Sequence, residues 1–222
     1  MSANLSKREI LRRKRQEQKR RTAITFILVA VAVILLILVA ILLPKFLTEN
    51  ASDTATPGFS IGDPDAPVTV VEFSSYTCSH CYTFNEDTAK NFIRDYVDTG
   101  MVYFTYINYP SNSEGSLRAA EASYCAADQG KFYEYKDQVF GNFAVADSFS
   151  EENLVAYANA AGLDVGAFEN CMASGKFSNA YIQDVQFAQQ SGVTATPTFL
   201  INGELLVTSS DLLPTVDNYL AN

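Results

Sequence analysis

One stretch of the sequence decides the fold, namely residues 68–81, Val-Thr-Val-Val-Glu-Phe-Ser-Ser-Tyr-Thr-Cys-Ser-His-Cys. Its first six residues, 68–73, are mostly β-branched and apolar, which is typical of a strand buried on both faces. The stretch ends with two of the four cysteines in the chain, Cys78 and Cys81, and includes its only histidine, His80. Two cysteines three residues apart, after a strand and at the start of a helix, can close a disulfide and reopen it. The pair is therefore a candidate for electron transfer.

The N-terminal part has the composition of a membrane anchor. Residues 7–21 carry nine of the sixteen Lys and Arg, and the 21 residues from 23 to 43 carry no charged side chain. That length is about what is needed to cross a hydrocarbon core of ~30 Å. The sequence therefore predicts a cytoplasmic basic segment at 1–22, a transmembrane signal anchor at 23–43 and a linker at 44–57. Because positive charge stays in the cytoplasm, the rest of the chain should be exported.

Two alternatives to this membrane topology remain open. A cleavable signal peptide is one, but its apolar region has only about 7–15 residues and is followed by an Ala-x-Ala site. No clear site of that kind follows residues 23–43, so we favour an uncleaved anchor. The basic segment could also bind nucleic acid. Its position beside a membrane span favours retention in the cytoplasm and contact with anionic lipid.

The part of the chain beyond the span is strongly acidic. Residues 46–222 hold 6 Lys and Arg against 23 Asp and Glu, a net charge of −17. Such a surface repels the phosphate backbone, so we expect no nucleic-acid partner. A well-solvated surface is a sufficient explanation for the charge. All four cysteines lie in this part, and export would place them where disulfides form and persist.

Patterns typical of strands and helices alternate along the exported part. A helix is expected at 78–97 and a second strand at 101–109. Alanine and glutamate then become frequent, and glycines mark the ends of helical segments. This pattern predicts a block of helices at 113–128, 131–140, 151–161, 164–173 and 177–191. Strand character returns at 198–201 and 204–207 around the hairpin signal Asn202-Gly203, and a helix at 211–221 closes the chain. This order predicts a small α/β unit with an inserted helical subdomain.

Four segments in this order resemble the DsbA-like thiol:disulfide oxidoreductases. They are Val71-Glu72-Phe73, Cys78-x-x-Cys81, Gln129-Gly130-Lys131-Phe132 and Gly192-Val193-Thr194-Ala195-Thr196-Pro197-Thr198-Phe199. The similarity covers about residues 58–221, and its specific parts are the Cys-x-x-Cys pair and the Thr-Pro pair. It implies an α/β thioredoxin fold with an inserted all-helical subdomain, preceded here by one transmembrane helix. The two thioredoxin-like parts would be 58–110 and 192–222, and the helical insertion 111–191.

The chain departs from the best-known motif of this family in ways that bear on the direction of electron flow. That motif is Cys-Pro-His-Cys, and here Ser79 stands in place of the proline. Many relatives have Asp where this chain has Ser75. Members of the wider family work as oxidases, reductases or isomerases, so Ser79 and Thr196 leave the direction of electron flow open.

The chemistry of a Cys-x-x-Cys pair assigns different roles to its two thiols. Cys78 should be the attacking thiolate, because the N-terminus of a helix stabilises negative charge. His80 adds a donor or a positive charge nearby, and such surroundings lower a thiol pKa from ~8.5 to ~3.5–7. Cys81, one turn inward, should be the resolving thiol.

Two other uses of the pair, a structural disulfide and a metal site, remain as alternatives. Zinc requires about four ligands, and with a single histidine only Cys125 and Cys171 could complete the set. Copper could use Cys78, Cys81 and His80, but adjacent ligands form a poor chelate. We therefore favour redox chemistry and expect no metal and no cofactor.

The resemblance implies three further site residues. The Thr196–Pro197 bond would be cis and face the cysteine pair, with the backbone of Thr196 pairing with the substrate chain. The alternative is a proline at a strand edge. Glu72 would be a buried acid beneath the disulfide, accepting the proton of Cys81 with a raised pKa, since burial disfavours the charged form. The alternative for Glu72 is an exposed carboxylate at a strand end.

The other two cysteines, Cys125 and Cys171, lie 46 residues apart on expected helices. An even number of cysteines in an exported domain favours a second, structural disulfide. Two free buried thiols, or a pair that exchanges with Cys78–Cys81, are the alternatives. Aromatic residues also cluster near the pair in sequence, and some of them could line an apolar groove for unfolded substrates.

Together these features predict a single-pass membrane protein with a cytoplasmic N-terminus and an extracytoplasmic catalytic domain. It would form disulfides in cysteine-containing exported proteins and be reoxidised by a membrane enzyme of the DsbB or vitamin K epoxide reductase type. A thiol reductase or isomerase of the same fold, for example one serving cytochrome c maturation with a membrane electron donor, is the alternative. A non-catalytic chaperone-like binding module is a third possibility.

Overall fold

The computed structural model describes residues 59–221. The expected basic segment 1–22, transmembrane anchor 23–43 and linker 44–57 lie outside the described residues. Within the described part, no helix combines the length and the apolar character needed to cross a membrane.

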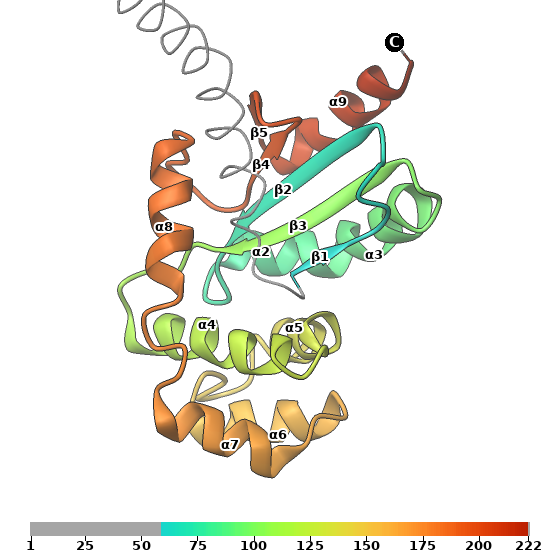
Figure 1. Cartoon of the computed structure of the whole chain (residues 1–222). Coiled ribbons are helices and arrows are strands. Elements are labelled where there is room, and N and C mark those ends of the chain that lie inside the picture. The colour runs from blue at the N-terminus through green and yellow to red at the C-terminus, as the bar shows by residue number, and fades with distance from the viewer. Residues whose placement is uncertain (1–58, 222) are drawn as a thin grey trace, which may run out of the picture. The chain divides into compact units, whose positions relative to one another are not determined.

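Within residues 59–221, five strands form one sheet in the order β1-β3-β2-β4-β5 (Figure 1). They are β1 (Ser60–Ile61), β2 (Val68–Ser74), β3 (Val102–Asn108), β4 (Thr198–Ile201) and β5 (Leu205–Val207). The central strands β2 and β3 are parallel, and the other neighbouring pairs are antiparallel. Parallel neighbours require a crossover connection, which the helical segment after the cysteine pair provides. Strand β1 was not expected, because two residues are too few to show a periodic pattern.

The segment after the cysteine pair is helical but not a uniform α-helix. It consists of α2 (Ser79–Phe84), the π-helical turn η1 (Asn85–Ala89), α3 (Lys90–Phe92) and a second π-helical turn η2 (Ile93–Val97). In the second turn Asp98 N donates to Ile93 O at 2.9 Å, five residues back. The expected helix 78–97 begins one residue later because Cys78 is its N-cap.

Four helices form a block on the connection between β3 and β4. They are α4 (Glu114–Ala127), α5 (Phe132–Gly141), α6 (Glu151–Ala160) and α7 (Val165–Ser174). Ser113, Ser150 and Asp164 cap α4, α6 and α7 by accepting backbone N–H groups, which satisfies donors that the helix leaves unpaired. The block shares one apolar cluster with Cys81, so its packing reaches the cysteine pair.

Helix α8 (Tyr181–Gln190) begins four residues after the expected start at 177. Gly175 ends α7 in a left-handed conformation, with φ of 63°, and turns closed by i to i+3 hydrogen bonds follow it. Although α8 falls within the range 111–191 expected for the insertion, its Ala188 packs against Phe73 and Leu200 of the sheet.

Helices cover both faces of the sheet. The segment from α2 to η2 and the last helix, α9 (Ser209–Ala221), pack on one face around Phe104, Phe199 and Leu212. Helix α8 packs against the other face. Figure 1 shows α9 beside β4 and β5, and the block of α4 to α7 below the sheet. The predicted thioredoxin-like α/β fold with a helical insertion is confirmed for the described residues.

The hairpin between β4 and β5 has the turn that its sequence indicated. Asn202 and Gly203 have φ angles of 49° and 72°, and Glu204 N donates to Ile201 O at 3.0 Å, so the turn lies where the sequence indicated. Because Ile201 pairs with Leu205, the loop has three residues and β5 begins one residue after the expected position 204. Helix α9 begins at Ser209 rather than at the expected residue 211. The side chain of Thr208 bonds to Ser210 Oγ at 2.9 Å and to Asp211 Oδ2 at 2.7 Å, which extends the first turn.

Candidate redox-active site

The cysteine pair lies at the start of α2, which follows β2 after a short loop. Cys78 is the N-cap residue of α2, and its Sγ accepts a hydrogen bond from Cys81 N at 3.4 Å. Cys78 is half-buried, whereas Cys81, in the first turn of the helix, is fully buried. Both side chains are free thiols in this structure. A partner molecule can therefore reach only the first sulfur of the pair.

The surroundings give the two thiols opposite acidities. A hydrogen bond from the side chain of Cys81, assisted by Thr196 and by backbone N–H groups, lowers the pKa of Cys78 from 9.0 to about 5. Burial, together with the hydrogen bond to Cys78, raises the pKa of Cys81 far above its ordinary value. Cys78 is thus the thiolate of the pair at neutral pH, and Cys81 holds the proton.

The single histidine contributes less directly than expected. His80 is exposed, and its effect on the Cys78 thiol comes through its backbone N–H group, which lowers the pKa of Cys78. The expected side-chain donor or positive charge is not among the main causes of that shift. The start of a helix supplies these N–H groups whatever the side chain, because its first turn leaves them unpaired.

The loop before β4 faces the cysteine pair. The peptide bond Thr196–Pro197 is cis, and Thr196 O lies 3.3 Å from Cys78 Sγ, where it can accept a hydrogen bond when Cys78 is protonated. These segments are 118 residues apart in sequence. They meet because β2 and β4 are antiparallel neighbours in which Phe73, near the end of β2, pairs with Thr198, the first residue of β4.

Glu72 is a buried acid on β2. Its side chain has 3% of its surface exposed, so it is not the exposed carboxylate that the sequence left as an alternative. The pKa of Glu72 is raised from 4.5 to about 7, chiefly by burial and to a smaller extent by the charge of Cys78. Lys136 and the Ser74 hydroxyl lower the pKa of Glu72 but do not offset its burial. Near neutral pH this carboxyl can therefore either hold or release a proton.

Lys136 of α5 is a buried cation that the sequence analysis missed. Its Nζ donates to Asn85 and, at 3.1 Å, to Asp137 Oδ1, and lies 5.8 Å and 5.7 Å from the ring centres of Tyr133 and Phe140. Nothing in the sequence marks this lysine, since a lysine on a helix is ordinarily solvated.

The aromatic residues near the pair are mostly core. The buried ones near the pair in sequence include Phe73, Tyr76, Phe84, Phe92, Phe104 and Tyr106. Tyr82 is half-buried and stacks on Phe143 from the helical block, with ring centres 4.9 Å apart.

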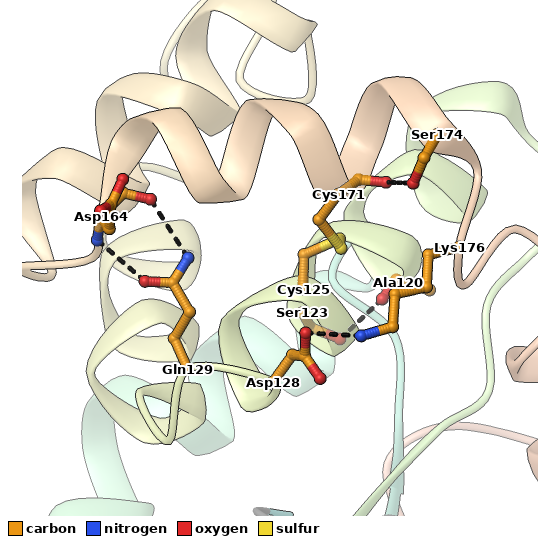
Figure 2. The surroundings of a disulfide bond; sticks show 9 residues. All are labelled: Ala120, Ser123, Cys125, Asp128, Gln129, Asp164, Cys171, Ser174 and Lys176. Atoms are coloured by element: carbon orange, nitrogen blue, oxygen red, sulfur yellow. Dashed lines mark hydrogen bonds and ion pairs between the residues drawn. A yellow bond between two sulfur atoms is a disulfide. The ribbon is translucent and has the colours of Figure 1, made fainter.

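The other two cysteines, Cys125 of α4 and Cys171 of α7, form a disulfide (Figure 2). A reciprocal pair of hydrogen bonds also joins Gln129, just after α4, to Asp164, the N-cap residue of α7. Asp164 N donates to Gln129 Oε1 at 2.8 Å, and Gln129 Nε2 donates to Asp164 O at 3.1 Å. The described residues contain no group of three or more His, Cys, Asp or Glu side chains placed to hold a metal ion.

A sequence model of a protein family, described as thioredoxin, matches residues 54–217. The chain belongs to the thioredoxin family. The matched range contains the cysteine pair, the Thr196–Pro197 loop and the helical block between them.

Solved structures within the thioredoxin family have the same fold. The structure of oxidised BdbD from Bacillus subtilis has a TM-score of 0.66 and 25% identity, over 74% of this chain and 93% of that chain. DsbA from Chlamydia trachomatis has a TM-score of 0.65 and 21% identity, over 73% and 91%. The fold is therefore the thioredoxin-like fold of DsbA-type oxidoreductases.

Curated relatives include proteins of two kinds. Disulfide bond formation protein D of Bacillus subtilis is 26% identical over 160 residues, which are 68% of this chain and 70% of the relative. The Na(+)/H(+) antiporter NhaA 3 of Salinispora tropica is 32% identical over 142 residues, or 64% of this chain. The chain spans only 21% of that antiporter's length.

Proposed function

We propose that the chain is an extracytoplasmic thiol:disulfide oxidoreductase, tethered by residues 23–43, that forms disulfides in exported proteins at Cys78–Cys81. The observation that carries this proposal is the asymmetry of the pair. An accessible Cys78 with a pKa of about 5 stands before a buried Cys81 that keeps its proton. A relative named for disulfide bond formation supports the same activity.

The proposed reaction uses the oxidised pair. A substrate thiolate attacks Cys78 Sγ, the Cys78–Cys81 bond breaks, and Cys81 leaves and takes up a proton. A second substrate thiolate then attacks the mixed disulfide, and Cys78 leaves as a thiolate. A thiol of low pKa is a good leaving group, which favours the second step, in which Cys78 leaves. The stabilised Cys78 thiolate also favours the reduced enzyme, so the two steps together favour oxidation of the substrate. Only sulfur and protons take part, so the reaction requires no cofactor.

Two further residues have proposed roles at this site. The backbone of Thr196, whose carbonyl oxygen lies 3.3 Å from Cys78 Sγ, would align the substrate chain beside the reacting sulfur. Glu72, with its pKa near 7, would exchange the proton that Cys81 gains when it leaves and loses when it attacks. In this scheme Cys125–Cys171 is a structural disulfide that takes no part in exchange.

The reduced pair must be reoxidised for a further turnover. We propose a membrane reoxidase of the DsbB or vitamin K epoxide reductase type as the partner, because the predicted anchor keeps both proteins in one membrane. A reductase or isomerase would instead draw electrons from a membrane donor. The lowered pKa of Cys78 favours the oxidase, since a stabilised thiolate makes the disulfide more oxidising.

Catalysed oxidation of a reduced, unfolded secreted protein tests this proposal. The full-length chain in detergent, first oxidised, should convert the substrate thiols to disulfides, and Cys78→Ser should abolish this conversion. The double variant Cys125→Ala, Cys171→Ala is the matched control, because it also removes a cysteine pair, and it should keep the activity. Substrate oxidation by Cys78→Ser at the unmodified rate would overturn the proposal, whereas an unmodified chain that binds the unfolded substrate without oxidising it would indicate a chaperone-like binding module.

A further inference from the structure

Ser74, the last residue of β2, has a buried hydroxyl group. It is fully buried, and its hydroxyl makes no hydrogen bond of standard geometry within residues 59–221. Most buried polar side chains are paired, because an unpaired one costs free energy. Within residues 59–221 the buried hydroxyls of Tyr76 and Tyr106 also make no such bond, so the position of Ser74, rather than its burial alone, has to indicate its role.

The position of Ser74 on the strand brings it between two groups of the site. Side chains two residues apart on a strand lie on the same face, so Ser74 and Glu72 point to the same side of β2. The Ser74 side chain interacts with the Glu72 carboxyl and with the Cys81 thiol, and it lowers the pKa of each. Burial, the largest cause, raises both of these pKa values.

Of the other groups near Glu72, Cys78 and Tyr106 also interact with Cys81, Tyr106 through charge alone. Those that interact electrostatically with Glu72 come from several elements and are Lys136, Cys78, Cys81, Tyr76, Tyr106 and Tyr133. The Nζ of Lys136 is bonded to Asn85 and Asp137. Tyr106 pairs with Glu72 in the register of β2 and β3, and its hydroxyl also interacts with Ser74.

We propose that the Ser74 hydroxyl is the proton relay between Cys81 and Glu72 during thiol–disulfide exchange. This inference rests on the proposed function and adds to it the route of the proton. A hydroxyl suits the task because it donates one proton and accepts another at the same oxygen. A hydroxyl without a fixed partner can rotate from one group to the other.

The proton and electron balance of the step is as follows. When Cys81 attacks Cys78 of a mixed disulfide, the Cys78–Cys81 bond forms and the bond from Cys78 to the partner sulfur breaks. The partner sulfur leaves with the electron pair as a thiolate. The proton of Cys81 passes to Ser74 Oγ, and the proton of Ser74 passes to the Glu72 carboxylate. The reverse transfer protonates Cys81 when it is the leaving group.

Oxidised glutathione separates the two steps of exchange in the full-length reduced chain. Cys78 first attacks it to give a mixed disulfide, and Cys81 then closes the Cys78–Cys81 bond and releases glutathione. Acid quenching followed by mass spectrometry of the intact protein measures both rates. We expect Ser74→Ala to leave the first rate unchanged and to slow the second by about tenfold or more.

The matched control is Ser116→Ala. Ser116 is also a buried serine, 1% exposed, but its hydroxyl accepts from Ser111 N at 3.0 Å and lies 3.2 Å from Ser75 Oγ. The control removes the same atoms without altering the contacts of Cys81 or Glu72, so both rates should stay near those of the unmodified chain.

The pH dependence distinguishes a relay from a packing effect. In the unmodified chain the second rate should rise near pH 7, as Glu72 loses its proton. Ser74→Ala should lose that inflection, and Ser74→Ala combined with Glu72→Gln should be no slower than the slower single variant. An unchanged second rate in Ser74→Ala, or additive losses with the inflection retained, would overturn the relay. Failure of Cys78 to form the mixed disulfide would overturn the proposed function as well.

Discussion

At the scale of single residues, the acidity of Cys78 is the property from which the proposed reactivity follows. With its pKa lowered to about 5 by the hydrogen bond from Cys81, the thiolate persists in mildly acidic solution. We expect alkylation of the reduced chain by iodoacetamide to occur at Cys78, with a pH midpoint near 5, and to spare Cys81. Mass spectrometry of the alkylated peptides measures this midpoint. A midpoint near 9 would contradict the assigned thiolate.

The same shift makes the stability of the reduced chain depend on pH. The pKa of Cys78 is lower in the folded chain than the ordinary value of 9.0 that applies when it is unfolded. The folded state therefore gains stability from the thiolate above pH 9, and loses this contribution as the pH falls through about 5. Because Cys78 is half-exposed, solvent weakens the effect.

At the scale of elements, the disulfide Cys125–Cys171 ties α4 to α7 across 46 residues of sequence. Restricting the unfolded chain over a loop of that length stabilises the fold by about 4 kcal/mol in the chain-entropy model. Replacing both cysteines by alanine should lower the unfolding free energy by an amount of this order and leave the potential of Cys78–Cys81 unchanged. Denaturant unfolding of the oxidised chain checks the first part. A shifted potential would contradict the independence of the two pairs.

Helix α8 is fixed to the rest of the fold by a buried carboxylate. Asp184 is 4% exposed and accepts hydrogen bonds from Asn108 N at 3.1 Å and from the hydroxyl of Tyr124. These contacts join α8 to the end of β3 and to α4. Because α8 leads directly into the loop containing Pro197, they also fix the segment that faces Cys78.

At the scale of the whole molecule, local patterns in the sequence predicted the order of strands and helices. They also predicted which cysteine of the pair is the attacking thiol and which is the resolving thiol. The Cys-x-x-Cys pair, the Asn202-Gly203 turn and the glycines between helices are short signals with a direct physical meaning. Residues whose roles depend on distant neighbours could not be predicted in this way. Lys136 and Asp184 look like ordinary charged residues on helices, and only the packing of those helices buries them. Only a weak indication in the sequence pointed to Ser74 lying beside Glu72, namely that Ser74 follows Glu72 by two residues on a buried strand and so lies on the same face.

The reduction potential of Cys78–Cys81 tests the central claim most directly. The full-length chain would be equilibrated with glutathione buffers and the reduced fraction measured by thiol trapping, with the alanine variant of Cys125 and Cys171 as a control. A stabilised Cys78 thiolate predicts an oxidising potential near that of DsbA, at about −120 mV. A potential near that of thioredoxin, at about −270 mV, would contradict the proposed oxidase and indicate a reductase.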